Sequence, residues 1–168
     1  MRKIRILNIV PDIYTEGIAV SVKDRQALAA ALKEAVAQLE AEGARLSALR
    51  DRLISGLTRL PYTRLTGDPE NRLPGTASMV FECVEGESIL LRLAAMGIQS
   101  SSGSACSSAS LDPSHVLLAI GLPHEIAHGS LRLTLSEETT KEDIDYTVDN
   151  LKAIVARLRS MSPLYEDF

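Results

Sequence analysis

The chain has 168 residues and a net charge of −4, with 45% hydrophobic and 24% charged residues, proportions that are ordinary for one folded domain. The acidic balance excludes the basic surface that binding to nucleic acid or to anionic membranes requires. No stretch is apolar over the ~18 residues that a membrane span needs, and no signal peptide is recognisable, so we expect a cytoplasmic protein. Its two cysteines lie outside any C-x-x-C pair, which predicts free thiols.

The first 23 residues are the least readable part of the chain. The stretch "KIRILNIV" places Ile4, Ile6 and Val10 on one side at strand spacing before Pro11, which predicts a short strand. We treat residues 1–23 as an N-terminal extension and residues 24–168 as the domain.

A long amphipathic helix is predicted over about residues 24–57. A capping box from Ser21 to Asp24 precedes it, and leucines then recur at spacings of three, four and seven. Because Gly43 interrupts the pattern, we expect this leucine stripe to pack across a sheet rather than to form a coiled coil. The stripe consists of Leu28, Leu32, Leu39, Leu46, Leu49 and Leu53.

The middle of the chain predicts a loop, a strand, a helix and a second strand. The loop is "TGDPENRLPG", and "TASMVFECV" then reads as a buried strand that ends with Cys83 as a small core residue. The run "EGESILLRLAAMG" predicts a helix closed by Gly97, and "IQSS" predicts a short strand.

The last third of the chain predicts two more helices around one strand. Asp112 and Pro113 predict an N-cap and a first helical position for "SHVLLAI", which ends at Gly121. The alternation in "GSLRLTL" predicts a half-buried strand, and a capping box from Thr140 to Asp143 begins the last helix. Its apolar face is formed by Ile144, Val148, Leu151, Val155 and Leu158. Alternating helices and short strands predict an α/β fold of two layers, with helices packed on a small, partly antiparallel sheet.

The stretch "SSSGSACSSAS", residues 100–110, places one cysteine among small residues. Serine and glycine favour a mobile surface loop, and a reactive thiolate needs access, hydrogen-bond donors and, if it travels, a flexible tether. Cys106 is therefore a candidate nucleophile. Its candidate loop residues are Ser101, Ser102, Gly103, Ser104 and Ala105. Composition alone also allows a tolerated small residue in a linker.

The stretch "HEIAH", from His124 to His128, matches the H-E-x-x-H pattern of zinc metalloproteases. Those zinc helices are long, whereas Pro123 and Gly129 bracket this stretch. Only His115 remains as a third histidine. A metalloprotease therefore stays a remote alternative.

Arg132 lies on the polar face of the strand predicted in "GSLRLTL". From that position a guanidinium can hold a carboxylate with two parallel hydrogen bonds. The alternative is an exposed arginine paired with a neighbouring glutamate.

Three stretches together resemble the C-terminal part of cysteine desulfurases, the pyridoxal phosphate (PLP) enzymes that supply sulfur for iron–sulfur clusters and thio-cofactors. They are "NRLPGTASMVFECVEGESILLRL", "GIQSSSGSACSSASLDPSHVLLAIGLPHEIAHGSLRLTL" and "TTKEDIDYTVDNLKAIV". The resemblance covers about residues 24–165 and implies the small C-terminal domain of fold-type I PLP enzymes, of the group with the longer cysteine loop. It implies that Cys106 takes sulfur from a cysteine held on the cofactor, becomes a persulfide and carries the sulfur to an acceptor protein. It also implies that Arg132 binds the substrate carboxylate, and it places "HEIAH" in a helix-to-strand turn without a metal.

The chain differs from this family in the residues that would bind the cofactor. PLP needs a lysine for its Schiff base, and the family's lysine follows a Ser-x-His motif. The lysines here, which lack such neighbours, are Lys3, Lys23, Lys33, Lys141 and Lys152. We therefore expect no cofactor-binding residue in this chain and no complete reaction by it alone.

The expected partners follow from this departure. They are a chain with the PLP domain, a sulfur-acceptor protein and a second copy of this chain, which would form a homo-oligomer through the leucine stripe or by exchange of that helix. A stand-alone sulfur-carrier or binding module is the alternative function.

Overall fold

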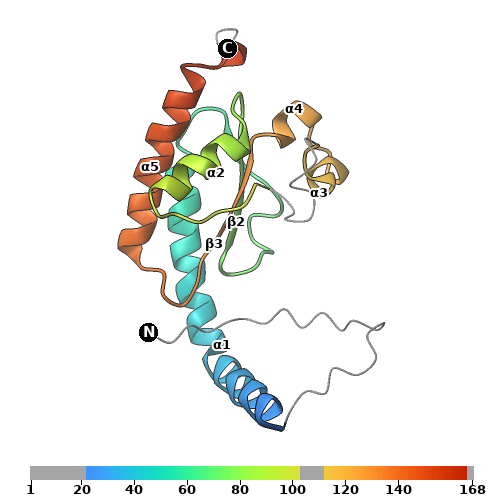
Figure 1. The fold of residues 1–168 in the computed structure, drawn as a ribbon, viewed down its shortest axis with the longest axis vertical. Helices are drawn as coiled ribbons and strands as arrows, with labels where there is room; N and C mark the ends of the chain where they lie inside the picture. The colour runs from blue at the N-terminus through green and yellow to red at the C-terminus, as the bar shows by residue number, and fades with distance from the viewer. Residues whose placement is uncertain (1–21, 103–111, 166–168) are drawn as a thin grey trace. The chain divides into compact units, whose positions relative to one another are not determined.

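The computed structural model describes residues 22–102 and 112–165 (Figure 1). It divides into two units, Met1–Leu39 and Glu40–Phe168. The strand expected from Ile4 to Val10 lies outside the described residues, as does Ser21 of the first capping box. Across the described ranges, no helix is long and apolar enough to cross a membrane.

The longest element is helix α1, Val22–Leu57, which confirms the predicted long helix. In the second unit its side chains Leu53 and Leu57 are buried, and Leu49 packs against them from the edge of the core. In the first unit every α1 residue from 23 to 39 is exposed. The expectation that the whole stripe packs on a sheet is therefore wrong for its N-terminal part, which contains Leu28, Leu32 and Leu39.

Three antiparallel strands form one sheet in the order β1-β2-β3. They are β1 (Thr63–Leu65), β2 (Thr76–Phe81) and β3 (Ser130–Thr134). The sequence predicted β2 and β3 but not β1, which is too short to show an alternation. The strand expected at "IQSS" is reduced to a single bridge between Ser101 and Arg132.

Helices lie on both faces of this sheet (Figure 1). In the second unit, α1, α2 (Gly86–Ala95) and α5 (Lys141–Arg159) pack on one face, and α3 (His115–Ala119) and α4 (His124–Ala127) lie on the other. A short 3-10 helix, Pro163–Tyr165, follows α5. The predicted two-layer arrangement of helices on a small antiparallel sheet is confirmed for the α1, α2 and α5 side, and α3 and α4 add a smaller cover on the other side.

The main core lies between the sheet and helices α1, α2 and α5. Its largest fully buried side chains include Leu53 on α1, Phe81 on β2, Leu93 on α2, Leu131 on β3 and Leu151 on α5. Each of these elements therefore contributes the apolar face that its sequence pattern predicted.

The C-terminal end of α2 follows the predicted glycine cap, whereas the N-terminal end of α3 differs from the prediction. The backbone N–H groups of Gly97 and Ile98 donate to the carbonyls of Ala94 and Leu93, both at 3.0 Å, and Gly97 has a φ of 80°, as a glycine C-cap requires. The N-cap of α3 is Ser114 rather than Asp112. The correction has a simple cause, because the first carbonyl that accepts a helical hydrogen bond belongs to Ser114.

The predicted capping box of α5 is confirmed. The Asp143 N–H donates to Thr140 Oγ1 at 3.2 Å, and the Thr140 N–H donates to Asp143 Oδ2 at 2.9 Å. The two hydrogen bonds that this carboxylate accepts from Thr140 hold the pKa of Asp143 below its ordinary value.

Cys83 does not lie in a buried strand, so that expectation is wrong. It is half-buried in the turn after β2, as a free thiol with a φ of 63°. The strand ends there because another backbone segment passes close by: a Cβ on Gly129 would lie 2.1 Å from the Phe81 carbonyl oxygen, and one on Gly86 would lie 2.2 Å from the Ser130 carbonyl oxygen. Only glycine permits this approach between the β2–α2 turn and the start of β3.

Arg159 links the C-terminal end of α5 to the segments next to β1 and β2. Its guanidinium donates to the carbonyls of Pro61 at 2.7 Å, Tyr62 at 3.0 Å and Glu82 at 3.1 Å, and it faces the ring of Tyr165. Burial lowers the pKa of this guanidinium from its ordinary value. No local sequence pattern predicts this contact, because its acceptors are backbone atoms that are distant along the chain.

Candidate functional site

Arg132 lies in the middle of β3 with its side chain exposed, between the buried Leu131 and Leu133. Alternation along a strand therefore directs Arg132 away from the main core, as the sequence predicted. Within residues 22–102 and 112–165, its side chain has no hydrogen bond and no ion pair. The guanidinium is available to a carboxylate from outside the described chain.

The same face of the sheet carries a second arginine, which is already paired. Ser78 on β2 lies opposite Arg132, and Thr66 Oγ1 lies 2.7 Å from Ser78 Oγ. By register and alternation Arg64 on β1 shares this face, and its Nε lies 2.9 Å from Glu82 Oε1. Of the two strand arginines on this face, Arg64 has a carboxylate partner and Arg132 has none among the described residues.

The segment that leads to the candidate cysteine forms backbone hydrogen bonds with Arg132. The Ser101 N–H donates to the Arg132 carbonyl at 3.0 Å, and the Arg132 N–H donates to the Ser101 carbonyl at 2.6 Å. In such a doubly bonded antiparallel pair the two Cα atoms are about 5.5 Å apart. The structure therefore brings Ser101 beside Arg132, a neighbourhood that the sequence did not predict.

Most of the predicted cysteine loop lies outside the described residues. Ser101 and Ser102 are described, whereas Gly103, Ser104, Ala105 and Cys106 are not. The role of Cys106 as a nucleophile stays a prediction, and so does the role of Arg132.

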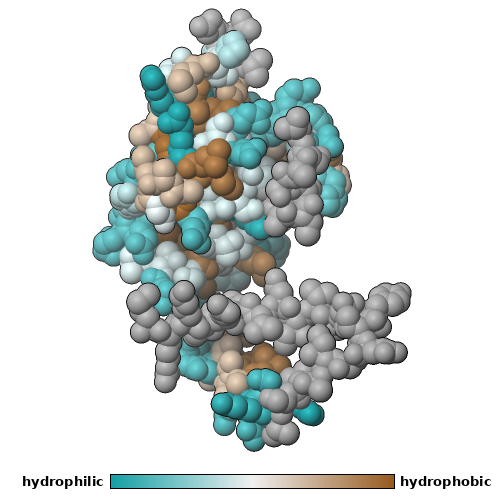
Figure 2. Space-filling view, viewed as in Figure 1, coloured by the Kyte–Doolittle hydropathy of each residue, from teal (hydrophilic) through white to brown (hydrophobic). Residues whose placement is uncertain are grey.

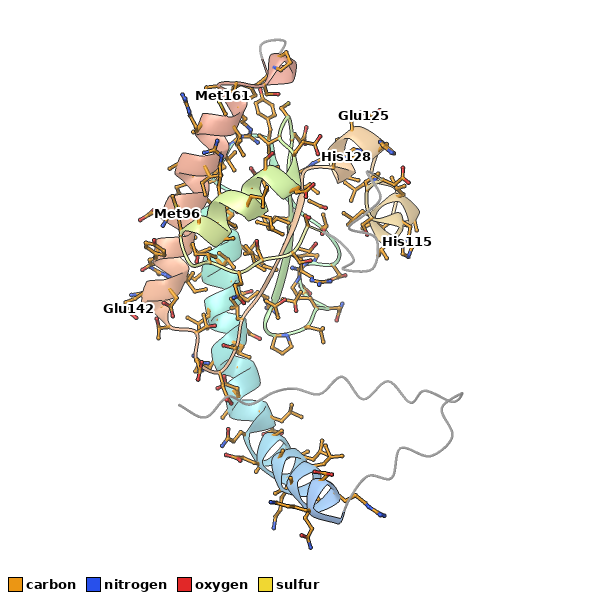
Figure 3. All side chains as sticks on the ribbon, viewed as in Figure 1. Met96, His115, Glu125, His128, Glu142 and Met161 are labelled. Atoms are coloured by element: carbon orange, nitrogen blue, oxygen red, sulfur yellow. The ribbon has the colours of Figure 1, made fainter. Side chains whose placement is uncertain are left out.

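The "HEIAH" stretch forms a short helix-to-strand connection, as expected. Helix α4 contains only His124–Ala127, Pro123 is its N-cap, and β3 begins at Ser130. The rings of His124 and His128 meet edge to face with centroids 4.7 Å apart. Figure 3 shows His128 and Glu125 at α4 and His115 on α3. The described part of the chain contains no group of three possible ligands that could hold a metal, and the zinc content stays a prediction.

The described lysines do not fit a PLP site around Arg132. Lys141 and Lys152 lie on α5, which packs on the other face of the sheet, and Lys23 and Lys33 lie in the first unit. Lys3 is outside the described residues. PLP requires a lysine close to the group that holds the substrate, and among the described residues of the second unit no lysine lies on the Arg132 face of the sheet.

Comparison with known proteins decides the family. Residues 19–147 match the sequence profile of the aminotransferase class-V family. The chain belongs to this family. It is 52% identical over 137 residues to the cysteine desulfurase IscS of Methanosarcina thermophila, covering 82% of this chain and 34% of that relative. It is 48% identical over 139 residues to the cysteine desulfurase NifS of Azotobacter vinelandii, covering 82% of this chain and 35% of that relative.

Solved structures agree with this assignment. A NifS-like protein with 30% sequence identity superposes with a TM-score of 0.66, over 76% of this chain and 32% of that protein. A putative sugar aminotransferase of Streptococcus pneumoniae, 15% identical with a TM-score of 0.54 over 73% of this chain and 33% of its own, shows the fold alone. The resemblance to cysteine desulfurases and the small α/β fold are confirmed, and the family match supports PLP as the cofactor of full-length members. The chain spans about a third of the length of these curated relatives.

Proposed function

We propose that this chain is the sulfur-accepting part of a cysteine desulfurase, an enzyme that converts L-cysteine to L-alanine and takes up the sulfur. Cys106 is the sulfur acceptor and Arg132 holds the substrate carboxylate. The observation that carries this proposal is the pair of hydrogen bonds between Ser101 and Arg132. The cysteine segment starts beside an exposed strand arginine that has no carboxylate partner in the described chain.

The short chain between Ser101 and Cys106 supports a shared site for Cys106 and Arg132. Cys106 follows Ser101 by five residues, and a chain of five residues spans at most about 18 Å. A substrate carboxylate on Arg132 and a thiol within that reach can therefore serve the same small molecule. Two parallel hydrogen bonds from the guanidinium would fix both the position and the orientation of the substrate.

The sulfur-transfer step at Cys106 is balanced without an oxidant or a reductant. The Cys106 thiolate attacks the terminal sulfur of a persulfide donor, and the sulfur–sulfur bond of the donor breaks as a new one forms on Cys106. The donor leaves as a thiolate. Because the described lysines do not fit PLP, a PLP-bearing chain completes the reaction with L-cysteine, and a sulfur-acceptor protein then receives the sulfur from Cys106.

The test loads the full chain with cysteine persulfide and measures bound sulfane sulfur by cyanolysis. Wild type and the matched control Cys83→Ser should each bind one sulfur atom, and Cys106→Ser should bind almost none. Circular dichroism confirms that each variant is folded. Equal loading of wild type and Cys106→Ser would refute the assignment of the acceptor.

A second arm tests Arg132 with a donor that either carries or lacks a free carboxylate. Arg132→Ala should slow loading from cysteine persulfide by roughly tenfold, the size expected for hydrogen bonds to a charged group, and should leave loading from its methyl ester unchanged. Arg64→Ala is the matched control, because Arg64 already pairs with Glu82. If Arg132→Ala and Arg64→Ala behave alike while Cys106 still accepts sulfur, the chain is a sulfur carrier without a substrate site.

A further inference from the structure

The outer edge of β3 lies next to the segment that follows α2. Across this edge, Ser101 and Arg132 exchange two backbone hydrogen bonds of 3.0 and 2.6 Å. In the antiparallel register of this bridge, Gln99 is the residue opposite Thr134. No backbone hydrogen bond joins Gln99 to Thr134. The pairing of the two segments therefore ends at the bridge, and the edge of β3 is open at Thr134.

The backbone N–H and C=O of Thr134 point to this open edge. On the β2 side, the Leu135 N–H donates to the Gly75 carbonyl at 2.7 Å, whereas Arg132 bonds to Ser101 on the opposite side. Successive residues of a strand direct their backbone groups to opposite neighbours, so Thr134 shares the direction of Arg132. Thr134 is exposed, and an edge strand with unpaired backbone groups is a template for another strand.

A cleft of about 440 Å³ lies between the two segments where they separate. It is lined by residues 97–99, by residues 133–136 and by the first two turns of α5, and Met96 lies at its α2 end (Figure 3). Leu133 and Ile144 give it an apolar wall. Figure 2 shows apolar and hydrophilic residues intermixed on the face that carries α2 and α5. The cleft therefore offers both apolar and polar contacts beside the open strand edge.

The charges of the cleft favour a basic occupant. Its described lining contains the carboxylates of Glu138 and Asp143 and no lysine or arginine. Asp143 already accepts hydrogen bonds from Thr140 in the capping box. Glu138 is exposed and forms no ion pair within residues 22–102 and 112–165. A lysine or arginine that enters the cleft therefore meets a carboxylate without displacing another cation.

We propose that this cleft and the β3 edge at Thr134 dock an extended segment of a partner protein, which adds to the sheet as a further strand. The backbone of the segment bonds to Thr134, alternate side chains face Leu133 and Ile144, and a basic residue pairs with Glu138. In strand addition, main-chain hydrogen bonds provide affinity and the pockets for alternate side chains provide specificity. The inference does not depend on the proposed chemistry of Cys106.

A synthetic peptide added to the full chain tests strand pairing. The probe is the acetylated and amidated hexapeptide KTVTVT, in which valines face one side and threonines the other. At millimolar concentration it should shift the amide resonance of Thr134 in the ¹⁵N-labelled chain and slow the hydrogen exchange of that amide.

Two methylated peptides are the matched controls. An N-methyl group on the threonine between the two valines removes the N–H that faces β3, and it should weaken binding roughly tenfold because the Thr134 carbonyl loses its donor. An N-methyl group on the first valine, whose N–H points away from β3, should cost less.

A pair of variants tests the charge. Glu138→Gln should weaken binding of the probe about two- to fivefold, the size expected for an exposed ion pair. Glu137→Gln removes the same charge from a neighbouring residue that does not line the cleft, and this variant should bind the probe like wild type.

Four results would overturn the proposal. The first is no binding of the probe at millimolar concentration, and the second is equal binding of the probe and its threonine-methylated form. The third is binding without a shift of the Thr134 amide, which places the site elsewhere. The fourth is slow exchange of the Thr134 amide before any probe is added. Such protection means that the edge is already paired, with a second copy if it rises with protein concentration and within one chain if it does not.

Discussion

The two ends of α1 share one leucine repeat but have opposite environments. In the first unit, Leu32 is 56% exposed, whereas in the second unit Leu53 is 1% exposed and Leu57 is 0% exposed. The same periodicity therefore continues from a solvent-exposed segment to a buried segment of a single helix. An apolar stripe predicts that a helix face will be covered, and it does not predict what covers it.

Local chemistry distinguishes the two ends. Near its C-terminus, α1 contains Gly56, whose backbone lies against Val148 on α5, and Arg52, whose guanidinium makes two contacts of 2.6 and 2.9 Å with the Asp145 carboxylate. Both features favour the packing of α1 on α5. Between the leucines of its N-terminal part the helix has mostly alanine, which favours the helix without selecting a partner from this chain.

The largest expected effect comes from truncation of equivalent leucines in the two parts. Leu57→Ala should lower the free energy of unfolding by about 2–5 kcal/mol, because it leaves a cavity in the core. Leu32→Ala should change it by less than about 0.5 kcal/mol, as for an exposed residue. Urea denaturation at a concentration where the chain is monomeric measures both. Similar losses for the two variants would mean that Leu32 is buried in solution.

A smaller effect, with opposite signs, comes from two glycines of α1. A Cβ at Gly56 would lie 2.9 Å from both Val148 methyl groups, whereas one at Gly43 would meet only Pro74 Cγ at 3.8 Å. Gly43→Ala should stabilise the protein by up to about 1 kcal/mol through helix propensity. Gly56→Ala should destabilise it, because overpacking costs about 1–3 kcal/mol. Thermal unfolding compares the two, and stabilisation by both would show that α1 and α5 do not cross closely at Gly56.

Elements with both a boundary signal and a periodicity were predictable from sequence. For α5 the Thr140–Asp143 box and the apolar repeat agreed, and for β3 the alternation around Arg132 gave the correct exposed face. These signals are local, because each depends on residues within one element.

Features that depend on contacts with backbone segments far away in the sequence were not predictable. The turn at Cys83 results from the close passage of the chain at Gly86 and Gly129, and the end of α5 is fixed by carbonyls that Arg159 reaches far along the sequence. The bridge between Ser101 and Arg132 is of the same kind. The sequence therefore identified the candidate arginine, and the fold was needed to join it to the cysteine segment.

The most direct test of the proposed function compares the reactivity of the two thiols in one wild-type sample. A limiting amount of iodoacetamide at neutral pH is added to the native protein, and mass spectrometry of the digest gives the labelled fraction of each cysteine. Cys106 should be alkylated roughly tenfold or more ahead of the half-buried Cys83, because access and thiolate fraction control the rate, and denaturation should make the two rates equal. Equal labelling in the native protein, or faster labelling of Cys83, would contradict the assignment of Cys106 as the reactive sulfur.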